Sequence, residues 1–183
     1  MSKWKDGELD DAAFAELASK RIDVENLMNY YAFFHGTALQ DNVFNNIYLY
    51  MLEREGETVY LHALWDMDTA FPIPATEEAM GKWAGLDLNM TLPRRMMDQN
   101  LLDCRTVFWS IWQEKRQSVF SDQAVSDLLW NTQDWINASS AYLRESERWY
   151  GEAQELNLEE MLYYQLQNMS RVEESMMEMW PAS

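Results

Sequence analysis

Two strand-like segments inside an otherwise helical chain place the strongest constraint on the fold. Residues 46–52 and 58–65 alternate in the manner of strands and are rich in aromatic and β-branched side chains. Residues 54–57, with the sequence Arg-Glu-Gly-Glu, have the composition of a turn between them. We therefore predict one antiparallel hairpin, because two strands this close in sequence pair most simply with each other.

Helical spacing of apolar residues dominates the rest of the chain. Asp23 is a predicted N-cap, and Gly36 falls near the end of the helix that follows it. Residues 69–92 carry loop signals, and helix is predicted to return after Pro93, with Arg94 and Arg95 at a solvated helix start. The predicted fold class is α+β and predominantly helical, with a small hairpin packed on a helical body. The predicted helices cover residues 8–20, the segment after Asp23, 101–118, 121–136, 138–150 and 157–179.

Composition indicates a single folded domain and limits the kinds of partner it can bind. The chain has 183 residues, 48% of them hydrophobic, which is enough for one domain with a sizeable core. A net charge of -17 disfavours nucleic acid and anionic membrane as partners, since both require a basic surface. No apolar stretch approaches the length of a membrane span, and the N-terminus has no apolar signal core. We expect a folded domain without an export signal in this sequence, and its compartment stays open.

The few residues that commonly carry metal or nucleophilic chemistry are better assigned to packing. The single cysteine, Cys104, excludes an internal disulfide and a cysteine-based zinc site, and its setting predicts a small core residue. His35 and His62 lie far apart in sequence without cysteine support, which argues against a metal site built on them. We predict that Cys104 is a core residue and that neither histidine is a ligand, with His62 either packed or on the surface.

Four polar side chains around the predicted hairpin form the candidate site. Asp41 and Asn46 precede the first strand or begin it, and Asp66 and Asp68 follow the second. A hairpin centred on its turn places Asn46 opposite residue 65 or 66, so an amide and one or two carboxylates would face the same cleft. Oxygen ligands of this kind suit a hard cation such as Mg²⁺ or Mn²⁺.

Phosphoryl transfer needs only a few protein groups, and these four side chains include several of the required types. One carboxylate accepts the proton of the attacking hydroxyl, while an amide and a second carboxylate hold the metal against the phosphates. In protein kinases the catalytic aspartate precedes the metal-binding asparagine by five positions, as Asp41 precedes Asn46, and a further metal-binding aspartate follows a short hairpin, as Asp66 does. The hypothesis depends on the combination of this spacing with the hairpin, Asp66 and Asp68, because an Asp and an Asn five positions apart are common by chance.

The same residues also fit a purely structural role or a calcium loop. In the structural role, Asp41 begins a turn, Asn46 satisfies backbone groups at a strand start, and Asp66 caps a loop. In the calcium loop, Asp66, Asp68 and Glu77 occupy positions of an EF-hand-like motif. The calcium loop fits poorly, because Phe71 stands where the turn glycine is required.

The chain resembles the CotH family of spore-coat and bacterial surface proteins, which have an atypical protein-kinase fold. The resemblance covers roughly residues 23–180 and is most specific in the strand Asn46-Ile47-Tyr48-Leu49-Tyr50 and in the motif Asp66-x-Asp68-x-x-Phe71. It implies a domain over residues 23–183 like the C-terminal lobe of such a kinase, preceded by a helical segment over residues 1–22. Further segments that carry the resemblance are Asp23 to Tyr30, Asp41 to Tyr50, Trp65 to Phe71, and Pro93 to Met97 with the helix that follows.

The resemblance also implies roles for the candidate site. Asp41 corresponds to the family's catalytic aspartate, Asn46 and Asp66 to its metal-binding residues, and Asp68 to a supporting carboxylate, with Mg²⁺ or Mn²⁺ and ATP as cofactors. Pro72 stands where the family usually has glycine, which affects the loop beyond the metal more than the carboxylates. The 40 residues before Asp41 contain neither a glycine-rich loop nor a lysine in a strand-like setting.

Two functions follow as hypotheses. The first is the C-terminal lobe of a CotH-like kinase that transfers the ATP γ-phosphoryl group to a protein hydroxyl and is inactive without a nucleotide-binding lobe, which a longer parent protein or another chain would supply. The second is a non-catalytic interaction module whose exposed Trp, Tyr and Met side chains bind another protein or the missing lobe. The protein substrate and the oligomeric state are not determined by the sequence.

Overall fold

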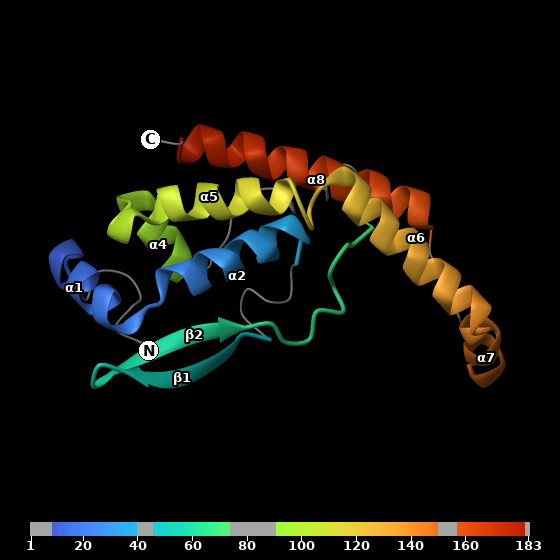
Figure 1. The fold of residues 1–183 in the computed structure, drawn as a ribbon, viewed down its shortest axis with the longest axis horizontal. Coiled ribbons are helices and arrows are strands. Elements are labelled where there is room, and N and C mark those ends of the chain that lie inside the picture. Colours follow the sequence, from blue (N-terminus) through green and yellow to red (C-terminus); the bar gives the residue numbers. More distant parts are fainter. Residues whose placement is uncertain (1–8, 40–45, 74–90, 150–156, 182–183) are drawn as a thin grey trace.

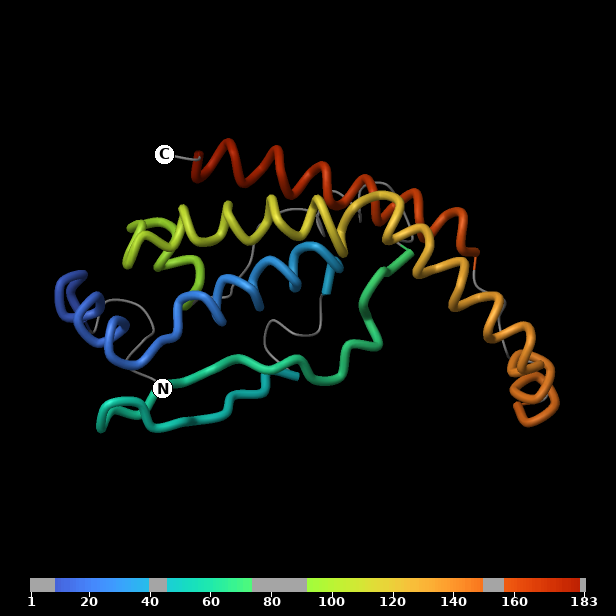
Figure 2. Tube along the Cα trace, in the orientation of Figure 1, coloured from blue at the N-terminus to red at the C-terminus, as the bar shows by residue number. Residues whose placement is uncertain are grey.

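The fold is a stack of helices with a two-stranded hairpin along one side (Figures 1 and 2). The structure is a computed structural model and describes residues 9–39, 46–73, 91–149 and 157–181. Helix α2 (Val24–Gly36) lies between the hairpin and α5 (Cys104–Arg116), and α8 (Leu158–Met179) runs along the far side of α5. The fold class is α+β and predominantly helical, as predicted.

Strands β1 (Tyr48–Arg54) and β2 (Glu57–Ala63) form the predicted antiparallel hairpin. Their ladder runs from the pair Arg54 and Glu57 at the turn to the pair Tyr48 and Ala63 at the open end. The turn residues Glu55 and Gly56 both have positive φ, of 54° and 81°, which matches the right-handed twist of the strands in a tight hairpin. Strand β2 faces the helices, where Val59 and Leu61 are buried, whereas β1 is the outer strand.

The first two helices begin at side-chain caps. Helix α1 (Asp11–Arg21) starts after Asp10, whose carboxylate accepts the amide N–H of Ala13 at 2.8 Å. Helix α2 starts after Asp23, which accepts the amide N–H of Asn26 at 3.0 Å, so the predicted N-cap is confirmed. The Asn26 side chain then bonds both backbone groups of His62, at 2.7 and 3.2 Å, and so fixes α2 against β2.

The hydrophobic core fills the space between α2, α5 and α8, and α1 contributes to it. Trp112 of α5 is almost fully buried, and its ring stacks on Phe108 at 6.0 Å between centroids. The C-terminal end of α8 is held by the indole of Trp109, which donates to the carbonyl oxygen of Trp180 at 2.9 Å. Other buried members of this core are Phe14, Ala18, Leu27, Met28, Tyr31, Phe34, Met96, Met97, Cys104, Val172 and Met176.

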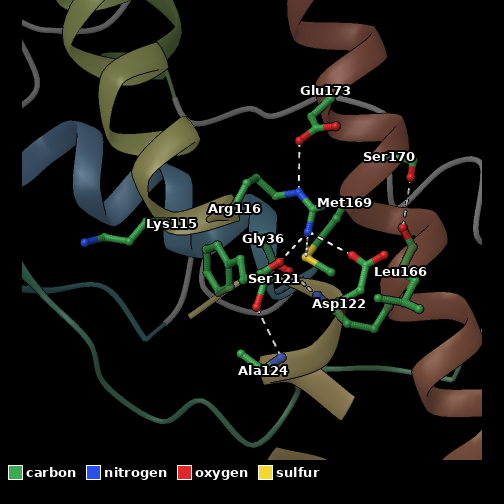
Figure 3. A network of polar contacts seen from close by, with 12 residues as sticks. Gly36, Lys115, Arg116, Ser121, Asp122, Ala124, Leu166, Met169, Ser170 and Glu173 are labelled. Carbon is green, nitrogen blue, oxygen red and sulfur yellow. Dashed lines mark hydrogen bonds and ion pairs between the residues drawn. The ribbon is translucent and has the colours of Figure 1, made fainter. Parts of the chain in front are cut away.

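Arg116 joins three elements in the network shown in Figure 3. Its Nε donates to the Glu173 carboxylate of α8 at 2.9 Å, and the same carboxylate oxygen accepts the indole N–H of Trp112 at 3.0 Å. An Nη of Arg116 donates to the carbonyl oxygen of Phe120 and to Asp122, which begins α6 (Asp122–Ala138). A partly buried arginine shared in this way orients α6 relative to α5 and α8.

Gly36 is needed for close packing at the end of α2. A Cβ atom at this position would lie 2.5 Å from Cε2 of Phe120, whose ring is buried between Phe33 and Trp112. The sequence indicates Gly36 as a weak point of the helix. In the structure it makes room for an aromatic ring that arrives from a distant part of the chain.

The helices after residue 120 follow the predicted order. Ser121 caps α6 by accepting the amide N–H of Ala124 at 3.2 Å, and Asn157 caps α8 by accepting that of Glu160 at 3.2 Å. Helix α7 (Ala141–Arg148) is shorter than the predicted 138–150 and packs on α6 at the far end of the molecule. Among the described residues, no helix combines the length and apolar character needed to cross a membrane.

The prediction for residues 91–103 was partly wrong. Helix α4 covers Thr91–Gln99, so helix is already present before Pro93, which lies in its first turn and costs no intrahelical hydrogen bond there. A short 3-10 turn, Leu101–Asp103, separates α4 from α5, where a continuous helix from 101 was expected. Left-handed backbone at Leu102 and Asp103 produces this break.

Arg95 is not a solvated residue, contrary to the prediction. Its guanidinium lies 4.1 Å from the centroid of the Phe14 ring and donates to the carbonyl oxygen of Leu9 at 2.8 Å. A further bond to Asp11 at 3.2 Å fixes α4 against the start of α1. Residues 9–22, part of the predicted N-terminal helical segment, thus pack on the same core as the rest of the chain.

Candidate functional site

Asn46 and Asp66 lie at the same, open end of the hairpin. Both residues have left-handed backbone, with φ of 53° at each, where the chain turns away from strand geometry. Asparagine and aspartate adopt this conformation more readily than other residues with a Cβ atom. The local backbone therefore explains why these residue types stand here, and the hairpin brings both residues to one end of the sheet.

The strands remain adjacent beyond their last regular pair. The rings of Tyr48 and Trp65 pack with their centroids 5.6 Å apart. Two residues beyond the last pair, Tyr48 and Ala63, lie Asn46 on one side and Trp65, the residue before Asp66, on the other. The regular ladder ends before these residues, so the predicted pairing of Asn46 with residue 65 or 66 stays a prediction.

The loop from Asp66 to Phe71 exposes its carboxylates and turns its apolar residues towards the core. Asp66 and Asp68 are exposed, while Met67 and Ala70 pack against the main core. A bond of 3.0 Å from the amide N–H of Ala70 to the carbonyl oxygen of Met67 closes a turn around Asp68. The two acids are therefore accessible to a ligand and are held on a loop whose other side chains are anchored.

This loop ends beside the C-terminus of α2. The amide N–H of Phe71 donates to the carbonyl oxygen of Thr37 at 3.0 Å. The Phe71 ring packs on a second apolar cluster formed by Phe120, Val125 and Met169. One end of the Asp66 to Phe71 loop thus lies at the open end of the hairpin, and the other lies beside the residues that follow α2.

Asp41 and Glu77 lie outside the described residues, so Asp41's role and the calcium-loop alternative stay predictions. The described residues on either side of Asp41 are Leu39, which is buried and donates to the carbonyl oxygen of Phe34 at 3.1 Å, and Asn46. Leu39 lies two residues after Thr37, whose carbonyl oxygen binds the end of the loop that carries Asp66 and Asp68.

A comparison of the sequence with protein-family models found a matching family. Residues 3–177 match the family described as CotH kinase protein. The chain belongs to the CotH family. No curated protein and no solved structure matches it significantly. The family match covers α1 as well as the region over which the sequence resembles this family.

The donor atoms of this candidate site fit a divalent cation in type. Two carboxylates and one amide provide hard oxygen ligands, and the carboxylates are open to solvent. In the described part of the chain, no three His, Cys, Asp or Glu side chains gather closely enough to hold a metal by themselves. A complete site would therefore need the Asn46 amide, Asp41 or oxygen atoms of a substrate, as Mg²⁺ commonly does.

Four of the described basic residues are bound to other parts of the chain. Lys20 binds Glu16 and Lys115 binds Glu114, both at 2.9 Å, and Arg95 is engaged by α1. Arg21 binds Glu57 at 2.8 Å, at the turn end of the hairpin and away from Asp66.

Cys104 is a buried residue, as predicted, His35 is buried and His62 is partly buried. His35 is buried, and desolvation lowers its pKa to about 3; the same cause lowers the pKa of partly buried His62 to about 4. Burial also raises the pKa of the Cys104 thiol to about 12. Neutral imidazoles and a protonated thiol in these positions contribute packing rather than acid–base or nucleophilic chemistry at neutral pH.

Two amides that contact the region of the site were not predicted from the sequence. Gln165 and Asn168 of α8 are buried, and both donate to carbonyl groups at the end of α2. Gln165 appears in the sequence as a polar interruption of the apolar stripe of α8, which was the available signal. A buried amide on an apolar helix face requires a hydrogen-bond partner, but the sequence does not identify it.

Proposed function

We propose that this chain forms the metal-binding lobe of a CotH-type phosphotransferase that transfers the ATP γ-phosphoryl group to a protein hydroxyl. The observation that carries the proposal is the position of Asn46 and Asp66 at one end of the hairpin, with Asp68 exposed on the same loop. Membership of the CotH family supports it, because the matching family is described as a kinase family.

In this proposal, each site residue has a distinct task. Asn46 and Asp66 bind the divalent cation through their side-chain oxygens, and Asp68 adds negative charge or a water-mediated contact. Asp41 accepts or orients the proton of the attacking hydroxyl. When bound, the cation would neutralise charge that develops on the transferred phosphoryl group. Held on anchored backbone, these ligands need little reorganisation before they bind.

ATP has to be bound mainly by groups other than those described. A nucleotide-binding lobe, supplied by further sequence or by a second protein, would cover the phosphates and contribute a lysine. The predicted partners are therefore this lobe and a protein substrate. We expect the chain alone to bind Mg²⁺ or Mn²⁺ weakly and to lack turnover of ATP.

The proposal predicts that neutralising Asp66 weakens Mn²⁺ binding far more than an equal change of charge elsewhere. Asp66→Asn should lower the affinity about 10-fold or more, because it removes an anionic ligand, and Asp68→Asn should have a smaller effect. Binding is measured as the loss of the free Mn²⁺ signal in electron paramagnetic resonance, at fixed ionic strength.

Asp134→Asn is the matched control, since Asp134 is an exposed acid on α6 and its replacement changes the net charge equally. The comparison is needed because a protein with a net charge of -17 attracts cations non-specifically. Equal affinities in Asp66→Asn and Asp134→Asn would reject a metal site at Asp66.

A non-catalytic interaction module is the second candidate, favoured by the apolar side chains that remain exposed. One group lies on and beside the hairpin and contains Tyr48, Tyr50, Met51, Leu64 and Trp65. Another lies on α6, α7 and the residue after α7 and contains Leu128, Trp130, Trp135, Leu143 and Trp149.

Adding a nucleotide-binding lobe as a separate chain discriminates between the two functions. Restored ATP turnover that is lost in Asp66→Asn excludes a purely non-catalytic module.

A further inference from the structure

Two buried amides of α8 bind the last backbone carbonyl groups of α2. The side-chain Nδ2 of Asn168 donates to the carbonyl oxygen of His35 at 2.8 Å, and Nε2 of Gln165 donates to that of Gly36. Both side chains are almost fully buried, with 5% and 2% of their surfaces exposed. Carbonyl groups at a helix C-terminus lack the usual intrahelical donors. The His35 carbonyl oxygen also accepts the amide N–H of Ala38 at 3.2 Å, so the amide of Asn168 adds a second bond there.

The carbonyl oxygen of the next residue is bound from the other side of the site. The Thr37 carbonyl oxygen accepts the amide N–H of Phe71, the last residue of the loop that carries Asp66 and Asp68. Three successive carbonyl groups, at His35, Gly36 and Thr37, are thus bound by α8 and by this loop. Asp41 and Asn46 follow Thr37 in the sequence.

Helix α8 and the loop also share one apolar cluster. The Phe71 ring packs on the cluster that contains Met169 of α8, which is adjacent in sequence to Asn168. Figure 3 shows Met169, Gly36 and Arg116 close together in this region. Helix α8 is thus linked to the loop through this cluster as well as through the end of α2.

We propose that Gln165 and Asn168 are positioning residues that hold the loop carrying Asp66 and Asp68 in place against the end of α2. The inference rests on the proposed metal site and adds the residues that fix the carboxylate loop of that site to the helices. Neither amide touches the metal: each acts through the backbone at the end of α2. Supporting groups outside the ligand shell commonly influence affinity in this way.

The test compares Gln165→Met and Asn168→Leu with Val172→Ala. The first two substitutions approximately preserve volume and remove the donor, whereas Val172 is a buried α8 residue of the main core with no part in the candidate site. The first readout is Mn²⁺ affinity, which should fall about 10-fold in the amide variants and remain unchanged in Val172→Ala. Denaturant unfolding establishes that each variant is folded and how much stability it has lost.

The second readout does not depend on metal. Hydrogen exchange of the Leu39 and Phe71 amides, which donate to the carbonyl oxygens of Phe34 and Thr37, should accelerate in the amide variants beyond what their global stability accounts for. If the wild-type chain shows no localised Mn²⁺ binding, the proposed function fails. Hydrogen exchange of the two amides then still reports whether α8 fixes the end of α2 and the loop that ends at Phe71.

Two results would overturn the inference. The first is exchange of Leu39 and Phe71 that follows global stability alone, as expected for Val172→Ala. The second is accelerated exchange without any change in Mn²⁺ affinity, because the amides would then stabilise the backbone without setting the site. If Gln165→Met does not fold, Asn168→Leu provides the same two readouts from the neighbouring bond.

Discussion

Replacing Trp112 by alanine is expected to lower the free energy of unfolding by about 3–5 kcal/mol, a loss typical of buried tryptophan truncations. Trp112 has 1% of its surface exposed and lies where α5 meets α8. Its ring contacts Phe108 and Phe120, and its indole N–H donates to Glu173. The substitution leaves a cavity and removes this donor, and chemical denaturation at fixed pH measures the combined loss.

Two controls separate packing from the hydrogen bond and from surface effects. Trp112→Phe keeps an aromatic ring and removes the donor to Glu173, so a loss of about 1–2 kcal/mol is expected from the bond and the smaller ring. Trp135→Ala removes a ring of which 72% is exposed, and a change within about 0.5 kcal/mol is expected. If Trp112→Ala costs no more than Trp135→Ala, the α5–α8 contact does not have the role assigned to it.

Acidification below pH 6.5 is expected to destabilise the protein through His35. The folded-state pKa of about 3 is below the ordinary value of 6.5, so the unfolded chain binds a proton more readily than the folded one. The stabilisation is complete above pH 6.5 and is lost as the pH falls towards 3. The free energy of unfolding should decrease by about 1.4 kcal/mol per pH unit from this residue within that range.

The measurement compares the pH dependence of unfolding in the wild type and in His35→Gln. The slope between pH 6 and pH 5 should be smaller in the variant by about 1.4 kcal/mol per pH unit. His62→Gln is a second comparison, since His62 also has a lowered pKa and should contribute in the same direction. Identical slopes in the wild type and His35→Gln would contradict a buried, neutral His35.

Features encoded by short stretches of sequence were predicted well. The hairpin and its turn follow from alternation and a Glu-Gly pair, and the cap at Asp23 follows from local hydrogen bonding. The register of β1 and β2 was predictable for the same reason, because the register of a tight hairpin is set by its turn. The pairing of Asn46 beyond that register stays a prediction.

Features that depend on contacts between distant residues were not predictable. Arg95 was expected in solvent, but it binds the carbonyl oxygen of Leu9, 86 positions away. Asn168 binds the carbonyl oxygen of His35, 133 positions away, and Gly36 is required by the ring of Phe120. Composition and periodicity indicate which side chains are buried, whereas the partner that satisfies a buried polar group is determined by tertiary packing.

The most direct test of a shared metal site is paramagnetic broadening by Mn²⁺ in the amide nuclear magnetic resonance spectrum. At Mn²⁺ concentrations well below that of the protein, a shared site predicts that the backbone signals of Asn46, Asp66 and Asp68 and the side-chain amide signals of Asn46 broaden first and together. Excess Mg²⁺ should restore them. Broadening that spreads over exposed acids of α6 and α7, or that affects Asp66 without Asn46, would contradict the claim that these residues bind one ion.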